Sequence, residues 1–207
     1  MSLRGDKKAY PRQKNEAYFT PASAIWPLMH VLLSVGLLDL AGTQFWEPAA
    51  GAGHIAKVIK YVGKSHKLLA TDLNPAEPQV HPVAKLDFLK STGPSGAKRL
   101  GIITNPPYGS QNKQAVAFIE HGLTLLAGTP GFMALLLPFE IDRSLSRNAL
   151  FVDHDFFAAK CTLGSRIRWV NLPQSENGPM GSHAWCIWCT DERIRRHLRM
   201  NYHGRVV

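Results

Sequence analysis

Short apolar runs alternate with stretches of helical periodicity along most of the chain, and this alternation constrains the fold more than any other feature. The apolar runs predict strands at residues 44–47, 67–71, 84–87, 101–104 and 132–137. The helical periodicity predicts helices at residues 21–33, 54–61, 114–126 and 143–152. Alternating units of this kind pack helices around a mostly parallel sheet, so we predict an α/β fold.

Two segments depart from this regular alternation. Residues 74–82 (NPAEPQVHP) contain three prolines, so we expect no crossover helix between the second and third strands. Two late strands are expected at 166–170 and 183–189, joined by the Pro/Gly-rich segment NLPQSENGPMGS. Such a connection is typical of a long hairpin, which makes the last strand antiparallel.

The charge of the chain favours a polyanionic partner. Lys and Arg number 24 and Asp and Glu number 15, which gives a formal net charge of +9. Five of the first fourteen residues are basic and one is acidic, so we expect a flexible basic arm over residues 1–15. The remaining residues, 16–207, suit a single α/β domain in length, and nucleic acid is the expected partner.

Several classes of protein are disfavoured. The longest apolar runs fall far short of the ~20 residues of a membrane helix, and no apolar run follows the charged N-terminus, so neither a membrane span nor a secretory signal is expected. Three cysteines make no disulfide framework and fit a reducing cytoplasm. Cys186 and Cys189 have metal-like spacing, but positions i and i+3 of a strand face opposite sides, so we expect buried thiols and no metal site.

The first chemical motif is EPAAGAGHIA, residues 47–56, where a strand gives way to a helix. Gly51 and Gly53 allow a tight turn that brings the backbone close to a ligand at the helix N-terminus. A tight loop without ligand is the alternative interpretation. Ala56 stands where the dinucleotide fingerprint has its third glycine, and the carboxylate of Glu47 suits a cationic group better than a pyrophosphate, so NAD and FAD are disfavoured.

Two acidic residues follow at the ends of later strands. Asp72 lies about twenty residues after the glycines, where a carboxylate can accept hydrogen bonds from two ribose hydroxyls. Asp87 ends the third predicted strand in KLDFL. Alone it reads as a turn residue, but its spacing after Asp72 favours a second ligand contact.

The most specific motif is Asn105-Pro106-Pro107-Tyr108, which directly follows an apolar strand. Consecutive prolines hold the backbone extended and donate no hydrogen bond, so the Pro106 carbonyl can accept one, and the Asn105 side-chain oxygen is a second acceptor. Two acceptors on one amino group draw its hydrogens out of conjugation and direct the nitrogen lone pair at an electrophile. The Tyr108 ring offers a stacking face for a base.

Together with Tyr18-Phe19-Thr20-Pro21, these motifs make residues 16–190 resemble a known family. The chain looks like the S-adenosylmethionine-dependent amino-group methyltransferases, and most like the DNA adenine-N6 methyltransferases that carry the NPPY motif. The resemblance implies a Rossmann-like class I methyltransferase fold, whose mostly parallel seven-stranded sheet has an antiparallel last strand. It implies S-adenosyl-L-methionine as the cofactor and methyl transfer to the exocyclic N6 of adenine in DNA, in a cytoplasmic protein of bacterial or phage type.

The resemblance also assigns roles to residues. The segment 18–21 would lie beside the methionine end of the cofactor, Asp72 would meet the ribose and Asp87 the adenine amino group. The residues implied to bind the cofactor are Tyr18, Phe19, Thr20, Pro21, Glu47, Pro48, Ala49, Gly51, Gly53, Asp72, Leu73, Asp87, Phe88 and Asn105. The implied catalytic residues are Asn105, Pro106, Pro107 and Tyr108.

One departure from the family concerns target recognition. Members that read a defined DNA sequence usually carry a separate recognition region, whereas about 17 residues follow the last predicted strand here. The reading of a defined DNA sequence is therefore not expected from this chain alone, and a partner that supplies recognition is one alternative. The segments able to contact nucleic acid are the basic arm, residues 142–168 and the Arg-rich residues 191–205. The Arg-rich residues equally suit a solvated helical face.

Three alternatives remain open. The tetrapeptide also suits an RNA methyltransferase acting on adenine or guanine amino groups. It suits protein glutamine methylation too, although enzymes of that kind carry an N-terminal helical domain and only about 40 residues precede the first strand. The third alternative is a non-catalytic nucleic-acid-binding subunit, which the intact Asn105–Tyr108 motif disfavours.

Overall fold

A computed structural model describes residues 18–38, 42–63, 67–172, 181–201 and 204–206 of the protein. The basic arm expected over residues 1–15 lies outside the described residues. In the part of the chain that is described, no helix combines the length and the apolar character needed to cross a membrane.

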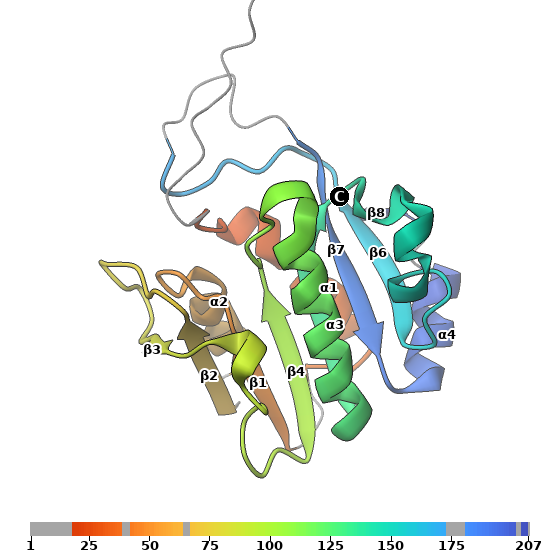
Figure 1. The fold of residues 1–207 in the computed structure, drawn as a ribbon, viewed down its shortest axis with the longest axis horizontal. Coiled ribbons are helices and arrows are strands. Elements are labelled where there is room, and N and C mark those ends of the chain that lie inside the picture. Colours follow the sequence, from red (N-terminus) through yellow and green to blue (C-terminus); the bar gives the residue numbers. More distant parts are fainter. Residues whose placement is uncertain (1–17, 39–41, 64–66, 173–180, 202–203, 207) are drawn as a thin grey trace, which may run out of the picture.

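One sheet organises the molecule, with its strands in the order β3-β2-β1-β4-β5-β7-β6-β8 (Figure 1). The strands are β1 (Thr43–Glu47), β2 (Lys67–Asp72), β3 (Ala84–Lys85), β4 (Arg99–Thr104), β5 (Gly131–Pro138), β6 (Phe157–Leu163), β7 (His183–Cys189) and β8 (Gly204–Val206). β7 is antiparallel to both β5 and β6, and the other described pairings are parallel. The predicted α/β class, mostly parallel with an antiparallel last strand, is confirmed, and β8 adds a short edge strand beyond the seven expected.

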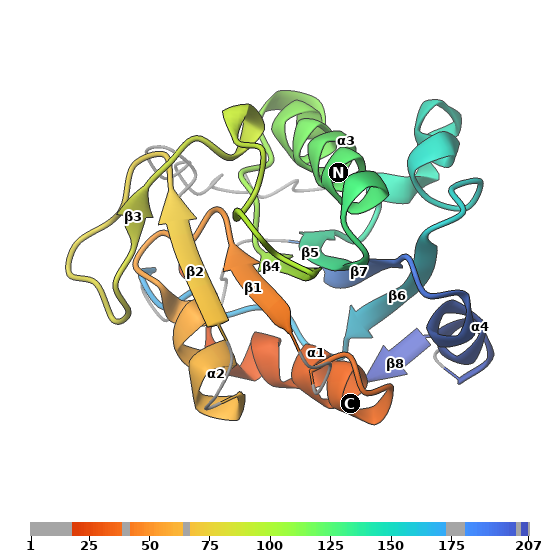
Figure 2. The same ribbon diagram turned by 90° about the horizontal axis from the view of Figure 1, so that it is seen from below.

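Helices cover both faces of the sheet. The helices are α1 (Ala22–Ser34), α2 (His54–Val62), α3 (Lys113–Gly128) and α4 (Glu192–Asn201). Seen from below, α1 and α2 lie on one side of the sheet and α3 lies on the other (Figure 2). Short 3-10 turns complete the fold: η2 (Phe88–Lys90), η3 (Ser110–Asn112), η4 (Ile141–Arg143) and η5 (Leu145–Leu150).

The side chains of β5 explain why this strand is apolar throughout. Alternate residues of a strand point to opposite faces of the sheet. Phe132, Ala134 and Leu136 join the core under α1 and α2, whereas Met133 and Leu135 join the core under α3. The strand is therefore buried on both faces of the sheet.

The strand predicted at 166–170 is wrong. The strand that pairs with β7 is β6, Phe157–Leu163, so the expected hairpin forms from an earlier segment. Ile167 and Trp169 are buried and their neighbours are exposed, so buried and exposed residues alternate here as they do in a strand. This segment makes no ladder; instead the Val170 N–H donates to the Phe19 carbonyl at 3.0 Å.

Other predicted boundaries also need correction. The helix expected at 143–152 is wrong, because this region forms the turns η4 and η5. Its Ser and Asn side chains compete with the backbone for hydrogen bonds and disfavour a regular helix. The third strand, expected to reach residue 87, is limited to Ala84–Lys85. The absence of a crossover helix before it is confirmed, since residues 73–83, all described, contain none.

Candidate active site

The chemical motifs meet at the carboxyl edge of the parallel strands. β1, β2 and β4 lie side by side and run in the same direction, so the residues that follow them emerge at one edge. A cavity of about 740 Å³ lies there, within the 300–1,000 Å³ usual for small-molecule sites. Its lining includes Glu47, Gly51, Asp72 and Asn105.

The glycine loop is shaped by two positive backbone angles. Gly51 has φ of 54° and Gly53 has φ of 87°, a region that favours glycine. A Cβ at Gly53 would lie 2.8 Å from both the Cβ and the carbonyl oxygen of His81. Glycine is therefore required at position 53 by the close approach of another segment, although Gly53 itself does not line the cavity.

Glu47 holds the start of helix α2 from the end of β1. Its Oε2 accepts a hydrogen bond from the Ala56 N–H at 2.5 Å, and the residue is buried. Gly53, the N-cap of α2, provides no side-chain cap, so Glu47 satisfies a donor of the first turn. Burial raises the pKa of Glu47 well above its ordinary value, the charge of Asp72 adds to this, and the bond from Ala56 opposes it.

This raised pKa predicts a pH-dependent stability. An acid with a higher pKa in the folded than in the unfolded chain stabilises the fold at pH below 4.5, and this contribution is lost as the pH rises through the folded pKa. We expect Glu47→Gln to gain stability relative to wild type as the pH rises. Urea unfolding of both proteins between about pH 5 and 8 measures this difference. A difference that stays constant with pH would contradict the assignment.

Asp72 and Asp87 both line the cavity and both organise loops. The Asp72 carboxylate accepts hydrogen bonds from the Gly51 N–H at 2.8 Å and from the Asn74 N–H at 2.7 Å. Asp87 caps η2 by accepting from the Leu89 N–H at 3.1 Å. Each acid is thus a turn residue, as the alternative interpretation of Asp87 held, and is also in position to contact a ligand.

Asn105 follows β4 directly, and its amide is oriented by three side-chain hydrogen bonds. Its Nδ2 donates to the Tyr18 carbonyl and to Thr20 Oγ1, both at 3.3 Å. Its Oδ1 accepts from the Tyr108 hydroxyl at 3.1 Å. The helix expected to begin at residue 21 begins at Ala22 without a side-chain cap, and the Thr20 hydroxyl contacts Asn105.

The strand that carries Asn105 is also joined to the glycine loop. Thr104, the last residue of β4, is buried, and its Oγ1 accepts a hydrogen bond from the Ala49 N–H at 3.3 Å. The tetrapeptide and the glycine loop are therefore held next to each other by a direct contact.

The Tyr108 ring lies outside the lining of the cavity. Its hydroxyl also lies 3.3 Å from the Leu136 carbonyl, a second acceptor, and its ring stacks on His183 with centroids 5.9 Å apart. The His183 ring also contacts the Trp169 ring, with centroids 5.4 Å apart. The Trp169 ring contacts the Tyr18 ring, with centroids 5.3 Å apart. Burial lowers the pKa of His183 to about 4, so this ring is neutral at neutral pH.

The segment at residues 18–20 lines the cavity, and residues distant in the sequence hold it there. The Phe19 N–H donates to Asn171 Oδ1 at 2.9 Å, and the Phe19 carbonyl accepts from Val170. The Phe19 ring stacks on His54 with centroids 5.1 Å apart. Sequence motifs alone gave no sign of these contacts with residues 170–171.

The cavity brings together most of the sequence-predicted site residues. Those that line it are Tyr18, Phe19, Thr20, Glu47, Pro48, Ala49, Gly51, Asp72, Leu73, Asp87, Phe88, Asn105 and Pro107. Those that do not are Pro21, Gly53, Pro106 and Tyr108. Lining residues absent from the predicted set are Ala50, His54, Ile55, Asn74, Pro75, Ala76, Leu89, Gly109, Gln114 and Phe118. Most of these residues adjoin a motif in the sequence, so adjacency could have predicted them. Gln114 and Phe118 lie on one face of the helix that follows the tetrapeptide, as their i, i+4 spacing indicates.

The described residues contain no group of three or more His, Cys, Asp or Glu side chains placed to hold a metal ion. Cys186 and Cys189 are buried in β7, as expected of core thiols. Burial raises the pKa of the Cys189 thiol to about 11.

No protein-family model and no curated protein matches the chain. Among solved structures, that of a candidate RNA methyltransferase from Pyrococcus horikoshii is similar, with a TM-score of 0.58 and 16% identity over 88% of this chain and 92% of that chain. That of a SAM-dependent methyltransferase from Anabaena variabilis has a TM-score of 0.51 and 12% identity, over 84% and 88% of the two chains. The chain therefore has the Rossmann-like fold of these proteins.

Proposed function

We propose that the chain is an S-adenosylmethionine-dependent methyltransferase that methylates the exocyclic N6 amino group of adenine in DNA. The observation that carries the proposal is the one cavity that Asn105 and Pro107 share with Gly51 and Asp72. Methyl transfer needs the donor and the acceptor nitrogen to approach to about 3–3.5 Å, so their binding groups must meet in one space. The fold similarity to a SAM-dependent methyltransferase supports the same cofactor.

The residues around the cavity fit this cofactor. When bound, S-adenosylmethionine supplies an electrophilic methyl group on a positively charged sulfur. Each Asp72 oxygen accepts one backbone N–H and retains a lone pair for a ribose hydroxyl. The Nδ1 of His54 is buried with no hydrogen-bond partner among the described residues, and His54 starts helix α2, where a carboxylate is favoured.

Asn105 and Pro106 would hold the target nitrogen. The Asn105 Nδ2 faces Tyr18 and Thr20, and its Oδ1 accepts from the Tyr108 hydroxyl, so one lone pair of Oδ1 remains to accept from a substrate amine. The Pro106 carbonyl is the second acceptor, and the two together orient the lone pair of the amine toward the methyl group. They also stabilise the extra positive charge on the nitrogen until water takes its proton, so catalysis is mainly positioning.

Tyr108 has two roles in this proposal. Its hydroxyl fixes the Asn105 oxygen, and its half-buried ring stacks on His183 with one face. As the resemblance implies, the ring would also stack on the target base, a contact worth about 1–3 kcal/mol in nucleic-acid complexes. An adenine in a duplex must rotate out of the stack to reach this position.

RNA is the second candidate acceptor. It is favoured by the similarity to the candidate RNA methyltransferase from Pyrococcus horikoshii, and the chemistry of the amine is the same. We prefer DNA because the Asn105–Tyr108 tetrapeptide most resembles that of the DNA adenine-N6 enzymes. The net charge of +9 suits either polymer.

The proposed function is tested by tritium transfer from labelled cofactor to DNA, RNA and total protein offered in competition. Nucleoside mass spectrometry of the labelled polymer should give N6-methyladenine from DNA. Label in RNA alone would favour the second candidate, and label in protein glutamine would overturn both.

The orientation of Asn105 leads to a prediction for Thr20. Thr20→Val removes the hydroxyl acceptor while keeping the shape, so the amide of Asn105 can turn its nitrogen toward the substrate. We expect kcat to fall about tenfold, a larger loss than that in cofactor affinity, because the effect is on positioning. Thr20→Ser keeps the hydroxyl and should restore kcat; a wild-type kcat in Thr20→Val would show that this contact is unimportant.

A further inference from the structure

We propose that Leu145 inserts between the bases of duplex DNA beside the target adenine, and so fills the gap left when that base rotates out. This inference rests on the proposed function. It concerns the β5–β6 connection, residues 139–156, which contains η4 and η5 and lies on the same face of the sheet as α3 (Figure 2).

The connection is attached to the segment that carries the tetrapeptide. Arg147 Nη2 donates to the Gln111 carbonyl at 3.1 Å, and Gln111 lies in η3, three residues after Tyr108. The connection also leaves β5 at the carboxyl edge of the parallel strands, the edge at which the cavity lies. Because Gln111 lies two residues after the lining residue Gly109, the proposal places this connection next to the DNA whose base enters the cavity.

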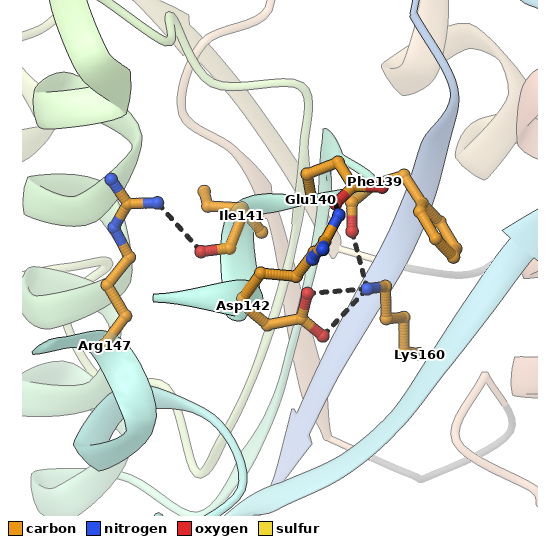
Figure 3. A network of polar contacts seen from close by, with 7 residues as sticks. Phe139, Glu140, Ile141, Asp142, Arg147 and Lys160 are labelled. Carbon is orange, nitrogen blue, oxygen red and sulfur yellow. Dashed lines mark hydrogen bonds and ion pairs between the residues drawn. The ribbon is translucent and has the colours of Figure 1, made fainter. Parts of the chain in front are cut away.

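The first half of the connection is held rigidly. Lys160 of β6 donates to the Phe139 carbonyl at 2.6 Å and to both Asp142 oxygens at 2.7 and 2.8 Å (Figure 3). The Lys160 and Asp142 side chains are 20% and 25% exposed, so solvent screens this pair only in part. Arg147 Nη1 donates to the Ile141 carbonyl at 2.8 Å, and the Ile141 side chain is fully buried.

On this rigid base, Leu145 is left in solvent. Its exposed fraction is 87%, whereas Ile141 before it and Phe151 after it are buried. A single exposed leucine is ordinary on a protein surface, but this one begins η5 between the anchors Asp142 and Arg147. Burying a leucine side chain is favourable, and apolar side chains inserted at a base step use that free energy to unstack it.

The charges nearby are complementary to DNA phosphates. Lys113, two residues after Gln111, is exposed, and neither Lys113 nor Arg147 is paired with a carboxylate among the described residues. Arg143, by contrast, pairs with Glu140. The positive charges of Lys113 and Arg147, neither of them balanced by a carboxylate in the described part of the chain, suit the phosphates that flank an opened base step.

The test compares the same adenine-containing DNA as duplex and after heat denaturation, with labelled cofactor and the full chain. We expect Leu145→Ala to lower the ratio of kcat/KM on duplex to kcat/KM on single strands by about tenfold, because only the duplex requires unstacking. Leu145→Met keeps a long apolar side chain and should restore most of the ratio. Val152→Ala, which truncates a 68% exposed valine of the same connection, should leave the ratio at its wild-type value.

An unchanged ratio in Leu145→Ala, or an equal loss on both forms of DNA, overturns the insertion of Leu145. An equal fall in the ratio for Val152→Ala overturns it as well, because the effect would not be specific to Leu145. Failure of the proposed function is distinguishable, since wild type would then methylate neither form of DNA.

Discussion

Replacing Asn105 by alanine is expected to lower kcat for methyl transfer by about 1,000-fold, while the cofactor still binds. The change removes the side-chain acceptor that the proposal places on the target nitrogen. It leaves the backbone of β4, the glycine loop and the carboxylate of Asp72 in place, since the hydrogen bond between Thr104 and Ala49 does not involve Asn105. Single-turnover transfer measures the chemical step, and calorimetry with the cofactor measures the binding.

Asn105→Asp is the matched comparison. Aspartate retains an acceptor at Oδ1 but lacks the Nδ2 donor, so it loses the bond to the Tyr18 carbonyl and keeps contact with Thr20 only if that hydroxyl donates. We expect an intermediate loss, because one acceptor remains in a less defined orientation. Turnover in Asn105→Ala at the wild-type rate would remove the basis of the proposed chemistry, whatever the acceptor polymer.

The parts of this site that could be predicted are those that follow strand ends. Asp72, Asn105 and the glycine loop each stand where an apolar strand stops, and parallel strands carry such residues to one edge. Their convergence follows from the strand pattern alone. The tight turn at Gly53 could also be predicted from the sequence. The close approach of His81, which makes glycine necessary there, could not.

The contacts that could not be predicted from the sequence join segments that are far apart in the chain. Phe19 is bonded to Asn171, 152 residues away, and no local pattern encodes such a pairing. The same holds for β6. Buried and exposed residues alternate at 166–170 as they do in a strand, and only the long-range pairing of β7 with residues 157–163 shows which segment is the strand. Tyr108 is a third case, since its contact with His183 depends on where β7 begins.

Asp72 gives the second large effect, and it tests the cofactor without reference to the methylated polymer. Asp72→Ala removes the acceptor of the Gly51 and Asn74 N–H groups. It also removes the group that we propose accepts from the ribose hydroxyls. We expect the affinity for the cofactor to fall by about 1–3 kcal/mol, measured by calorimetry. A loss of this size could arise from the disturbed loop alone, so a single variant does not identify the contact.

A cofactor analogue that lacks one ribose hydroxyl separates the two causes. If Asp72 accepts a hydrogen bond from that hydroxyl, the losses from Asp72→Ala and from the analogue overlap, and their combined effect is smaller than their sum by about 0.5–3 kcal/mol. Asp87→Ala is the control: Asp87 lines the same cavity and caps η2, but it is assigned to the adenine end, so its loss should add fully to that of the analogue. Additive losses for Asp72→Ala would mean that its carboxylate only shapes the loop at Gly51, and the ribose would have to be held by another group of the cavity.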